Sequence, residues 1–409
     1  MQLGKLQIPK LNIEPFAFVH DFQTQLFLQY VNIVEKTEIG KTLVETLSND
    51  SRVKALEGKM ISHGSGGQGF DVKTLAMWFL WCANEYGPDG AEEYLNSFLN
   101  ENVVPVLNAL WVLGVEATEP IKLQGGFEIL PIDKLPDSRD KEMFLQSRFG
   151  YAVHIKSLPA SAITYSCKVQ KARNSDTPFS TNEDAEFWQS GHRLYEIALL
   201  LNALDNISCL PYFSTSYAYP TTPFGLFSGS GGGSSVYDVL GQNTTKLTAD
   251  AQTTIDEIIH DYDKLRDSEK ARFQRILHRL SQAKRRNQIE DMILDLGITL
   301  EMLLLEDNKN NDQLSLSFRL RGSWLLGETE EERMAIYIQL REIYNYRSQV
   351  AHSGILCKGD NRKIQQVQEA FPNYQLLAER ICRLMLKNGK PNWDKIVLNV
   401  SSQNKSQLT

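Results

Sequence analysis

Residues 341–354, with the sequence REIYNYRSQVAHSG, combine a histidine and two arginines at spacings typical of a helix. An imidazole gives and takes protons near neutral pH, which makes the histidine a candidate for acid–base chemistry. Residues three and four apart are neighbours on a helix. One side of this segment is therefore a polar stripe made of Arg341, Asn345, Ser348 and His352. Arg347 lies away from that stripe, where the spacing predicts an apolar residue.

The pattern Arg-x-x-x-x-His, with a small polar residue after the arginine and Val-Ala before the histidine, resembles HEPN domains, and more narrowly the Apea-like group. Two upstream segments are similar to the same group. Residues 295–304 (DLGITLEMLL) resemble its apolar helix with a Leu-Glu step, and residues 316–327 (LSFRLRGSWLLG) resemble the helix that follows. The resemblance covers residues 268–386. The two-residue pattern alone is common by chance, whereas three segments in the right order are a stronger signal.

The resemblance implies an all-helical domain that cuts RNA without a metal ion or other cofactor, leaving a 2′,3′-cyclic phosphate and a 5′-hydroxyl. Arg347 would hold the phosphate and His352 would act as acid or base, so these are the predicted catalytic residues. The predicted supporting residues are Ser348, Asn345 and Glu301. The predicted RNA-binding residues are Arg341, Arg321, Arg279, Arg285 and Arg286. The resemblance also implies a role in prokaryotic defence, in which a variable front domain directs a toxic ribonuclease.

Members of this family usually act as dimers with their motifs facing each other, and the spacing offers a physical reason. Positions five apart on an ideal helix lie roughly 140° from each other. One helix therefore presents Arg347 and His352 awkwardly to a single phosphate, whereas two antiparallel copies offer the arginine of one and the histidine of the other. We expect a homodimer formed through this domain, with RNA as its substrate.

Glu301 follows the spacing of leucines and isoleucines on a side of its helix that should be buried. An unpaired buried carboxylate is destabilising, so we expect an arginine partner, either Arg347 or Arg321.

The predicted helix over residues 269–288 carries seven lysines and arginines. It is either an RNA-backbone track or an ordinary solvated helix face, and the sequence leaves both open.

Two other functions fit the sequence. The first is a non-catalytic HEPN scaffold that binds RNA or dimerises. The second is a ligand sensor whose activity lies in the front half, for example in the Tyr/Pro-rich segment 211–224, with an invader-derived or small-molecule trigger. The glycine-rich segment 63–69 lacks the Gly-Lys-Ser/Thr of a phosphate-binding loop, and we interpret it as a flexible loop.

The elements that would position these residues differ between the two halves. Helical spacing runs through residues 250–388 and predicts helices at 250–267, 269–288, 289–305, 313–326, 330–352 and 362–386. The front half is predicted to mix helices (75–86, 92–99, 101–113, 186–204) with strands (127–130, 152–155, 162–169). The Gly/Ser stretch 228–235 is predicted to be a linker.

Composition and charge complete the prediction, an α+β chain. We expect a mixed α/β sensing or regulatory region over 1–245, an all-helical HEPN-type bundle over 250–390 and a polar tail over 391–409. Residues 251–409 hold 24 Lys+Arg and 22 Asp+Glu, whereas the preceding residues hold 19 and 28, an asymmetry that suggests different partners for the two parts. Five scattered cysteines give neither a disulfide framework nor a metal site. Without a signal peptide or a long apolar run, we expect a soluble cytoplasmic protein that does not contact the membrane.

Overall fold

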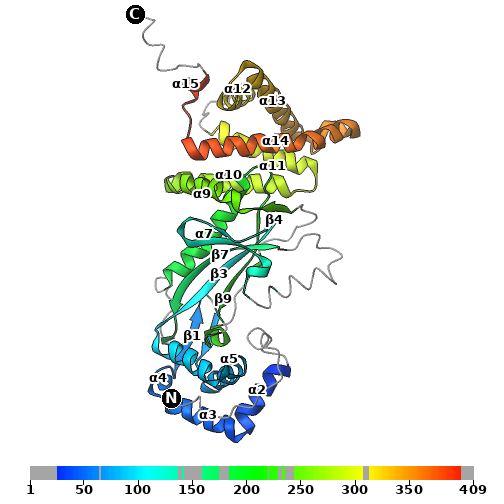
Figure 1. The fold of residues 1–409 in the computed structure, drawn as a ribbon. Coiled ribbons are helices and arrows are strands. Elements are labelled where there is room, and N and C mark those ends of the chain that lie inside the picture. The colour runs from blue at the N-terminus through cyan, green and yellow to red at the C-terminus, as the bar shows by residue number, and fades with distance from the viewer. Residues whose placement is uncertain are drawn as a thin grey trace, which may run out of the picture.

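The chain folds into three layers stacked along one long axis, an α+β architecture as predicted (Figure 1). The computed structural model describes residues 25–63, 66–136, 141, 159–174, 184–219, 221–228, 233–234, 244–306 and 313–397. N-terminal helices lie at one end, an antiparallel sheet lies in the middle, and the C-terminal helices lie at the other end (Figure 1). The predicted strand 152–155 and residues 398–409 of the predicted tail fall outside the described residues.

The central sheet has the strand order β10-β9-β3-β7-β6-β5, and every neighbouring pair is antiparallel. Its strands are β3 (Val103–Leu113), β5 (Ile121–Lys122), β6 (Phe127–Pro131), β7 (Ser161–Gln170), β9 (Leu210–Ala218) and β10 (Gly233–Ser234). Helix α7 (Ala185–Leu200) covers one face, and buried Asn108 of β3 donates to Phe187 O and Ser190 Oγ of that helix, at 3.0 and 2.8 Å. The predicted strands 127–130 and 162–169 and the helix 186–204 are confirmed, although residues 201–203 form a 3-10 turn, η4 (Leu201–Ala203).

The predicted helix at 101–113 is wrong, because these residues form β3 in the middle of the sheet. Val106 to Leu113 are buried on both faces, so the strand shows none of the alternation that marks a half-exposed strand. Pro105 fits because β3 pairs with β9 only from Val106 onward, which leaves one side of the strand unpaired at the proline.

The described part of the N-terminal end is built from the helices α2 (Gln25–Lys36), α3 (Glu38–Asn49), α4 (Ser51–Lys54) and α5 (Val72–Asn100). The predicted helices 75–86 and 92–99 both lie within α5, which bends at the non-helical Gly87. The loop predicted at 63–69 is wrong in part. β1 (Lys59–His63) and β2 (Gly66–Gly69) form a hairpin in which His63 pairs with Gly66, and β8 (Arg173–Asn174) extends it. Fully buried Ile61 anchors the hairpin to the core of this end.

The six helices predicted from the C-terminal spacing are all present. They are α9 (Gln252–Asp263), α10 (Asp267–Arg285), α11 (Ile289–Leu304), α12 (Leu314–Leu326), α13 (Glu330–Ser353) and α14 (Asn361–Asn388). The expectation of a polar tail from residue 391 is wrong for its first residues. They form a short helix, α15 (Trp393–Val397), whose buried Trp393 lies under the Arg321 guanidinium, 5.0 Å from the ring centroid.

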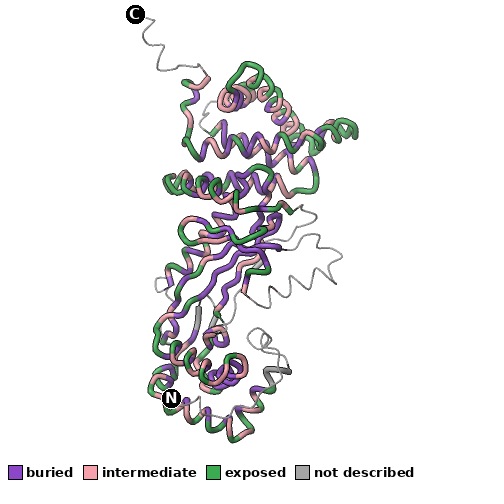
Figure 2. Tube along the Cα trace, viewed as in Figure 1, coloured by how far each residue is buried: buried purple, intermediate pink, exposed green. Residues whose placement is uncertain are grey.

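The sheet and the C-terminal helices share one continuous core rather than meeting at a thin linker. Buried residues run from β3 and α7 through α9 and α10 to α14 (Figure 2). The chain enters the helical region through β11 (Thr245–Leu247), which pairs in parallel with β4 (Val115–Ala117) of the front region. Of the predicted linker 228–235, residues 233–234 form β10 and residue 228 ends α8 (Phe224–Ser228), while 229–232 and 235 lie outside the described residues.

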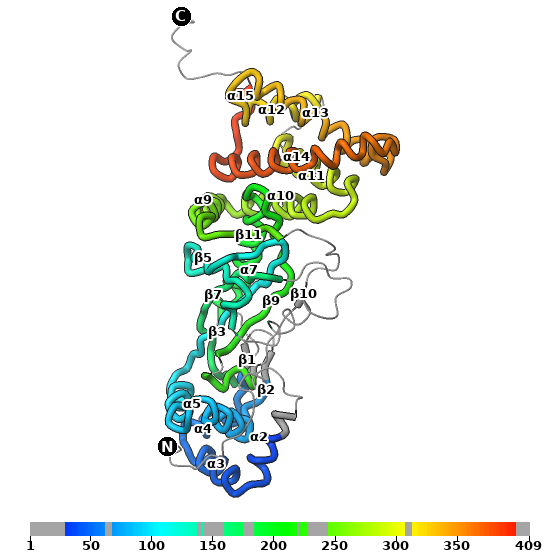
Figure 3. Tube along the Cα trace, turned by 45° about the vertical axis from the view of Figure 1, so that its right-hand side comes forward, coloured from blue at the N-terminus to red at the C-terminus, as the bar shows by residue number. Residues whose placement is uncertain are grey.

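A buried ion pair ties the helices to the front region at this junction. Lys284 of α10 and Glu379 of α14 lie 2.6 Å apart, and their side chains are 1% and 0% exposed. Lys284 Nζ also donates to the carbonyls of Asn202 and Ile207, and Glu379 accepts from the backbone N–H of Asn206. Figure 3 shows α10 lying between the strands and α14. Both helices are therefore fixed to the turn that joins α7 to β9.

Candidate functional site

The ends of α13 are set by its own sequence. Thr329 Oγ1 accepts a hydrogen bond from the N–H of Glu332, and the Glu332 carboxylate accepts one from the N–H of Thr329, which forms a capping box. Gly354 ends the helix in the left-handed conformation at φ 69°, which a residue with a side chain rarely adopts. His352 therefore lies in the last turn of α13, as predicted.

Arg347 lies on the buried side of α13 and packs against α11. Leu340 and Ile343 of that side are fully buried in the core. Where Arg347 crosses α11, the opposite residue is Gly297, and a Cβ at that position would lie 2.5 Å from Arg347 Cγ and 2.7 Å from Arg347 Cβ. Glycine is thus required at 297 for the arginine stem to reach its place.

Glu301 is the ion-pair partner of Arg347, which confirms one of the two partners predicted for it. Arg347 Nη2 donates to Glu301 Oε2 at 2.8 Å, and the two side chains are 28% and 23% exposed. Burial raises the pKa of Glu301 above its ordinary value by more than the Arg347 charge lowers it. The other predicted partner, Arg321, instead donates to the carbonyl of Leu304 at 2.7 Å, at the end of α11.

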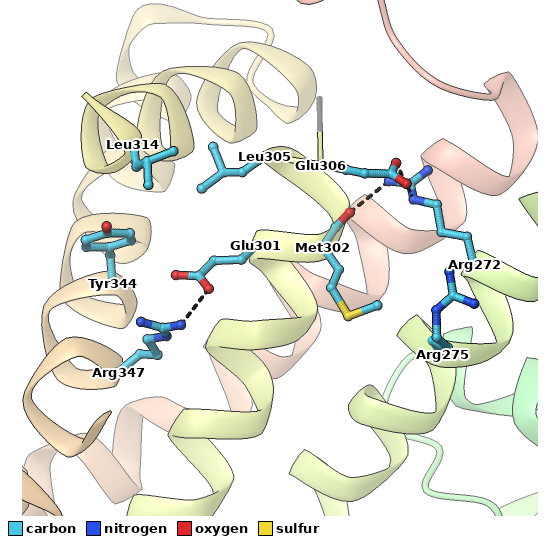
Figure 4. Close-up of a pocket in the computed structure, with 9 residues that line it drawn as sticks. All are labelled: Arg272, Arg275, Glu301, Met302, Leu305, Glu306, Leu314, Tyr344 and Arg347. Carbon is cyan, nitrogen blue, oxygen red and sulfur yellow. Dashed lines mark hydrogen bonds and ion pairs between the residues drawn. The ribbon is translucent and has the colours of Figure 1, made fainter. Parts of the chain in front are cut away.

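The Arg347–Glu301 pair lines a cavity of about 460 Å³ between α10, α11 and α13 (Figure 4). The cavity is lined by Arg272, Arg275, Glu301, Met302, Leu305, Glu306, Leu314, Tyr344 and Arg347. Arg272 is held by Glu306, at 2.6 Å, and donates to the carbonyl of Met302. Arg275 is exposed at the rim. Three guanidinium groups against two carboxylates leave a net positive charge, which suits an oxyanion such as a phosphate.

The structure separates His352 from this cavity. His352, Asn345 and Arg341 are exposed on the solvent side of α13, Ser348 is half-buried, and none of the four lines the cavity. Within one chain, the predicted catalytic pair therefore faces two different sides of the helix. This agrees with the roughly 140° expected for positions five apart.

The arginines predicted to bind RNA along α10 have other contacts. Arg279 and Arg286 each form an ion pair with buried Asp295 of α11, at 2.9 and 3.0 Å, and Arg285 is half-buried. Arg272 and Arg275 belong to the basic helix predicted to be either an RNA-backbone track or a solvated face, but neither they nor Tyr344 were predicted as site residues. Arg272 left a further signal, because it lies next to Phe273 on the apolar side of α10.

The described part of the chain contains no group of three or more His, Cys, Asp or Glu side chains arranged to hold a metal ion. No described helix combines the length and apolar character needed to cross a bilayer. Comparisons of the chain with protein-family models, with curated proteins and with solved structures gave no match. The assignment of function therefore rests on the residues and their geometry.

Proposed function

We propose that this protein is a metal-independent endoribonuclease of the HEPN type, acting as a cytoplasmic homodimer in prokaryotic defence. Arg347 binds the scissile phosphate, and His352 transfers a proton during cleavage to a 2′,3′-cyclic phosphate. The observation that carries the proposal is the fixed guanidinium of Arg347 beside a cavity with two further arginines, on the same helix that ends in an exposed histidine. A planar fork held by a carboxylate is preorganised for a phosphate.

The exposed side of α13 supports the participation of a second copy. Met334 and Ile338 are 56% and 37% exposed, and they continue the stripe of Arg341, Asn345 and His352 by steps of three and four residues. An apolar patch on a polar helix side is typical of a surface that another chain covers. For the partner's His352 to meet Arg347, the second copy must extend from this side of α13 to the mouth of the cavity, because one helix cannot present both groups to one phosphate.

Cleavage of total RNA in EDTA by the full-length protein tests the proposal. Arg347→Ala and His352→Ala are each expected to lower the cleavage rate at least about 100-fold, the contribution of one well-placed catalytic group. Arg362→Ala and His260→Ala remove exposed residues of the same types from α14 and α9 and should leave the rate unchanged. RNA that is bound but stays intact with the wild type would favour the non-catalytic scaffold.

Mixing the two inactive variants tests the shared site. If arginine and histidine come from different chains, a mixture of Arg347→Ala and His352→Ala chains regains a fraction of the activity in its heterodimers. The full chain is used because its core continues from the sheet into the helices, so a fragment starting at residue 250 would expose buried residues of α9 and α10. No recovery in a mixture with proven subunit exchange rules out a shared site.

A sensing role for the front region is the second candidate, and two cavities favour it. One, of about 440 Å³, lies between α7 and the sheet and is lined by Phe127, Tyr165, Glu186, Gln189, Ser190, His192, Arg193 and Glu196. The other, of about 270 Å³, is lined in part by Tyr219, Thr221 and Thr222 of the predicted segment 211–224. A trigger bound in the first cavity could regulate the helices through the shared core, because Phe127 and Tyr165 pack against that core. A ligand that raises the melting temperature of the wild type, but not that of variants of these lining residues, would support the sensing role.

A further inference from the structure

The acid–base group closest to Arg347 within one chain is Glu301, not His352. The Glu301 carboxylate touches the guanidinium at 2.8 Å and points into the cavity, whereas His352 does not line it (Figure 4). A phosphate bound by Arg347 would therefore lie within reach of this carboxylate. Proton transfer needs a group within hydrogen-bond distance of the proton that it takes, so geometry favours Glu301 for any step inside the cavity.

Arg347 keeps most of its hydrogen-bonding capacity for a ligand. A guanidinium carries five N–H donors, and only the bond from Nη2 to Glu301 joins Arg347 to another described side chain. Its Nε is buried and has no hydrogen-bond partner among the described residues. The stem cannot move toward α11, because Gly297 already lies in contact with it. The Arg347 guanidinium is thus held in place but keeps N–H donors for a ligand.

Glu301 has an environment suited to accepting a proton. The Glu301 carboxylate points toward Arg347 and Tyr344 of α13 (Figure 4). The other charged groups that line the cavity, Arg272, Arg275 and Glu306, lie beyond Met302 on the far side of α11 (Figure 4). Burial raises the pKa of Glu301, so that the carboxylate binds a proton more readily than an exposed glutamate does.

We propose that the cavity between α10, α11 and α13 is a nucleotide subsite in which Arg347 holds the phosphate and Glu301 is the catalytic base. Glu301 takes the proton of the ribose 2′-hydroxyl as O2′ bonds to phosphorus. The bond from phosphorus to O5′ breaks, and the leaving O5′ takes a proton from His352 of a second copy, a role that rests on the proposed function. Solvent then removes the proton from Glu301 and returns one to His352.

Glu301→Gln and Glu301→Asp test the base in the full-length protein. Glu301→Gln keeps the shape and is expected to lower kcat at least about 100-fold and to remove the fall of activity at low pH. Glu301→Asp should keep that fall with a smaller loss of kcat. Asp50→Asn is the matched control, because Asp50 forms a half-buried ion pair with Arg52 far from the cavity and asparagine still caps α4. It should leave kcat and the pH profile unchanged.

Two results separate this inference from the proposed function. If Arg347→Ala and His352→Ala abolish cleavage while Glu301→Gln, folded by circular dichroism, keeps the wild-type rate and pH profile, the base assignment is overturned and the nuclease stands. If the wild type cuts no RNA, both the proposed nuclease activity and the role of Glu301 as a base are wrong. The nucleotide subsite is then tested by ligand binding alone. Titration calorimetry should then show binding of adenosine 3′-monophosphate that Arg347→Ala weakens at least 10-fold. Equal binding of inorganic phosphate would reduce the subsite to a simple anion site, and no binding of either would overturn it.

Discussion

Two acid–base pairs in the helical region have the same charges but opposite surroundings. Lys284 and Glu379 are enclosed between α10, α14 and the turn after α7, and backbone carbonyls and N–H groups occupy their remaining hydrogen-bonding capacity. Arg347 and Glu301 share a single hydrogen bond beside a cavity of about 460 Å³. The polar side-chain atoms of Lys284 and Glu379 are thus all hydrogen-bonded within the protein, whereas Arg347 keeps several N–H donors for a ligand.

The contrast distinguishes an ion pair that stabilises the fold from one that can take part in a reaction. A charge that is fully buried must be completely satisfied by its own protein, and it then fixes how two regions are joined. A half-buried charge beside a cavity can exchange a protein partner for a ligand without that penalty. The region around α10, α11 and α13 is therefore the better place to look for a reaction, and the junction at Lys284 is the better place to look for structural integrity.

The largest expected effect is on stability, at the enclosed pair. Glu379→Ala leaves the Lys284 ammonium buried without its counter-charge and should lower the free energy of unfolding by about 3–5 kcal/mol. Glu301→Ala opens a half-buried pair and should lower it by about 1 kcal/mol or less. Urea unfolding followed by circular dichroism measures both. Equal losses for the two variants would contradict the contrast between the pairs.

A smaller effect is expected from crowding the arginine without changing any charge. The methyl group of Gly297→Ala would overlap the stem of Arg347, so the free energy of unfolding should fall by about 1–3 kcal/mol. Displacement of the guanidinium by about an ångström should also slow RNA cleavage by roughly 10- to 100-fold.

Gly191→Ala is the control for that variant. Gly191 lies within α7, and a Cβ there would meet no atom within 4 Å. Alanine favours a helix over glycine, so this change should raise the free energy of unfolding by about 0.5–1 kcal/mol. A gain at Gly297 like that at Gly191 would show that Arg347 is not held where the structure has it.

The helices of the C-terminal region could be predicted from the sequence because each one buries a single side. Their spacing of apolar residues repeats every three and four positions, and Gly354 ends α13 where predicted. Strand β3 could not be recognised, because burial on both faces removes the alternation that distinguishes a strand. The helix α15 has too few residues for a periodic pattern, and its position depends on the burial of Trp393 in the core and on the contact of that ring with Arg321.

The site could be predicted in part. A carboxylate in an apolar register needs a cation, so the sequence indicated that Glu301 has an arginine partner. The choice of Arg347 over Arg321 depends on how α11, α12 and α13 cross, and the close approach at Gly297 settles it. The cavity itself combines residues of α10, α11 and α13 whose spacing in sequence carries no common signal. For that reason Tyr344 was not named from the sequence, and Arg272 was placed on a basic helix but not at this site.

The smallest expected effect is a pH dependence that has opposite signs at two carboxylates that each pair with an arginine. Hydrogen bonding to Arg52 lowers the pKa of Asp50 to about 2, whereas burial raises that of Glu301 above its ordinary 4.5. A lowered pKa means that the unfolded chain binds the proton more tightly, so Asp50 adds stability as the pH rises from about 2 to its ordinary 3.8. A raised pKa means the reverse, so the contribution of Glu301 is largest at low pH and is lost as the pH rises from 4.5 through its raised pKa.

Unfolding free energies of the wild type relative to Asp50→Asn and Glu301→Gln, measured from pH 2 to pH 7, should show these opposite slopes. A single proton gives at most about 1.4 kcal/mol per pH unit, so each difference stays small and is read against its own variant. A Glu301 difference that rises with pH, as for Asp50, would mean that Arg347 outweighs burial. Glu301 would then be a fixed counter-ion of Arg347 and a weaker base than an exposed glutamate, which would remove the electrostatic support for its assignment as the catalytic base.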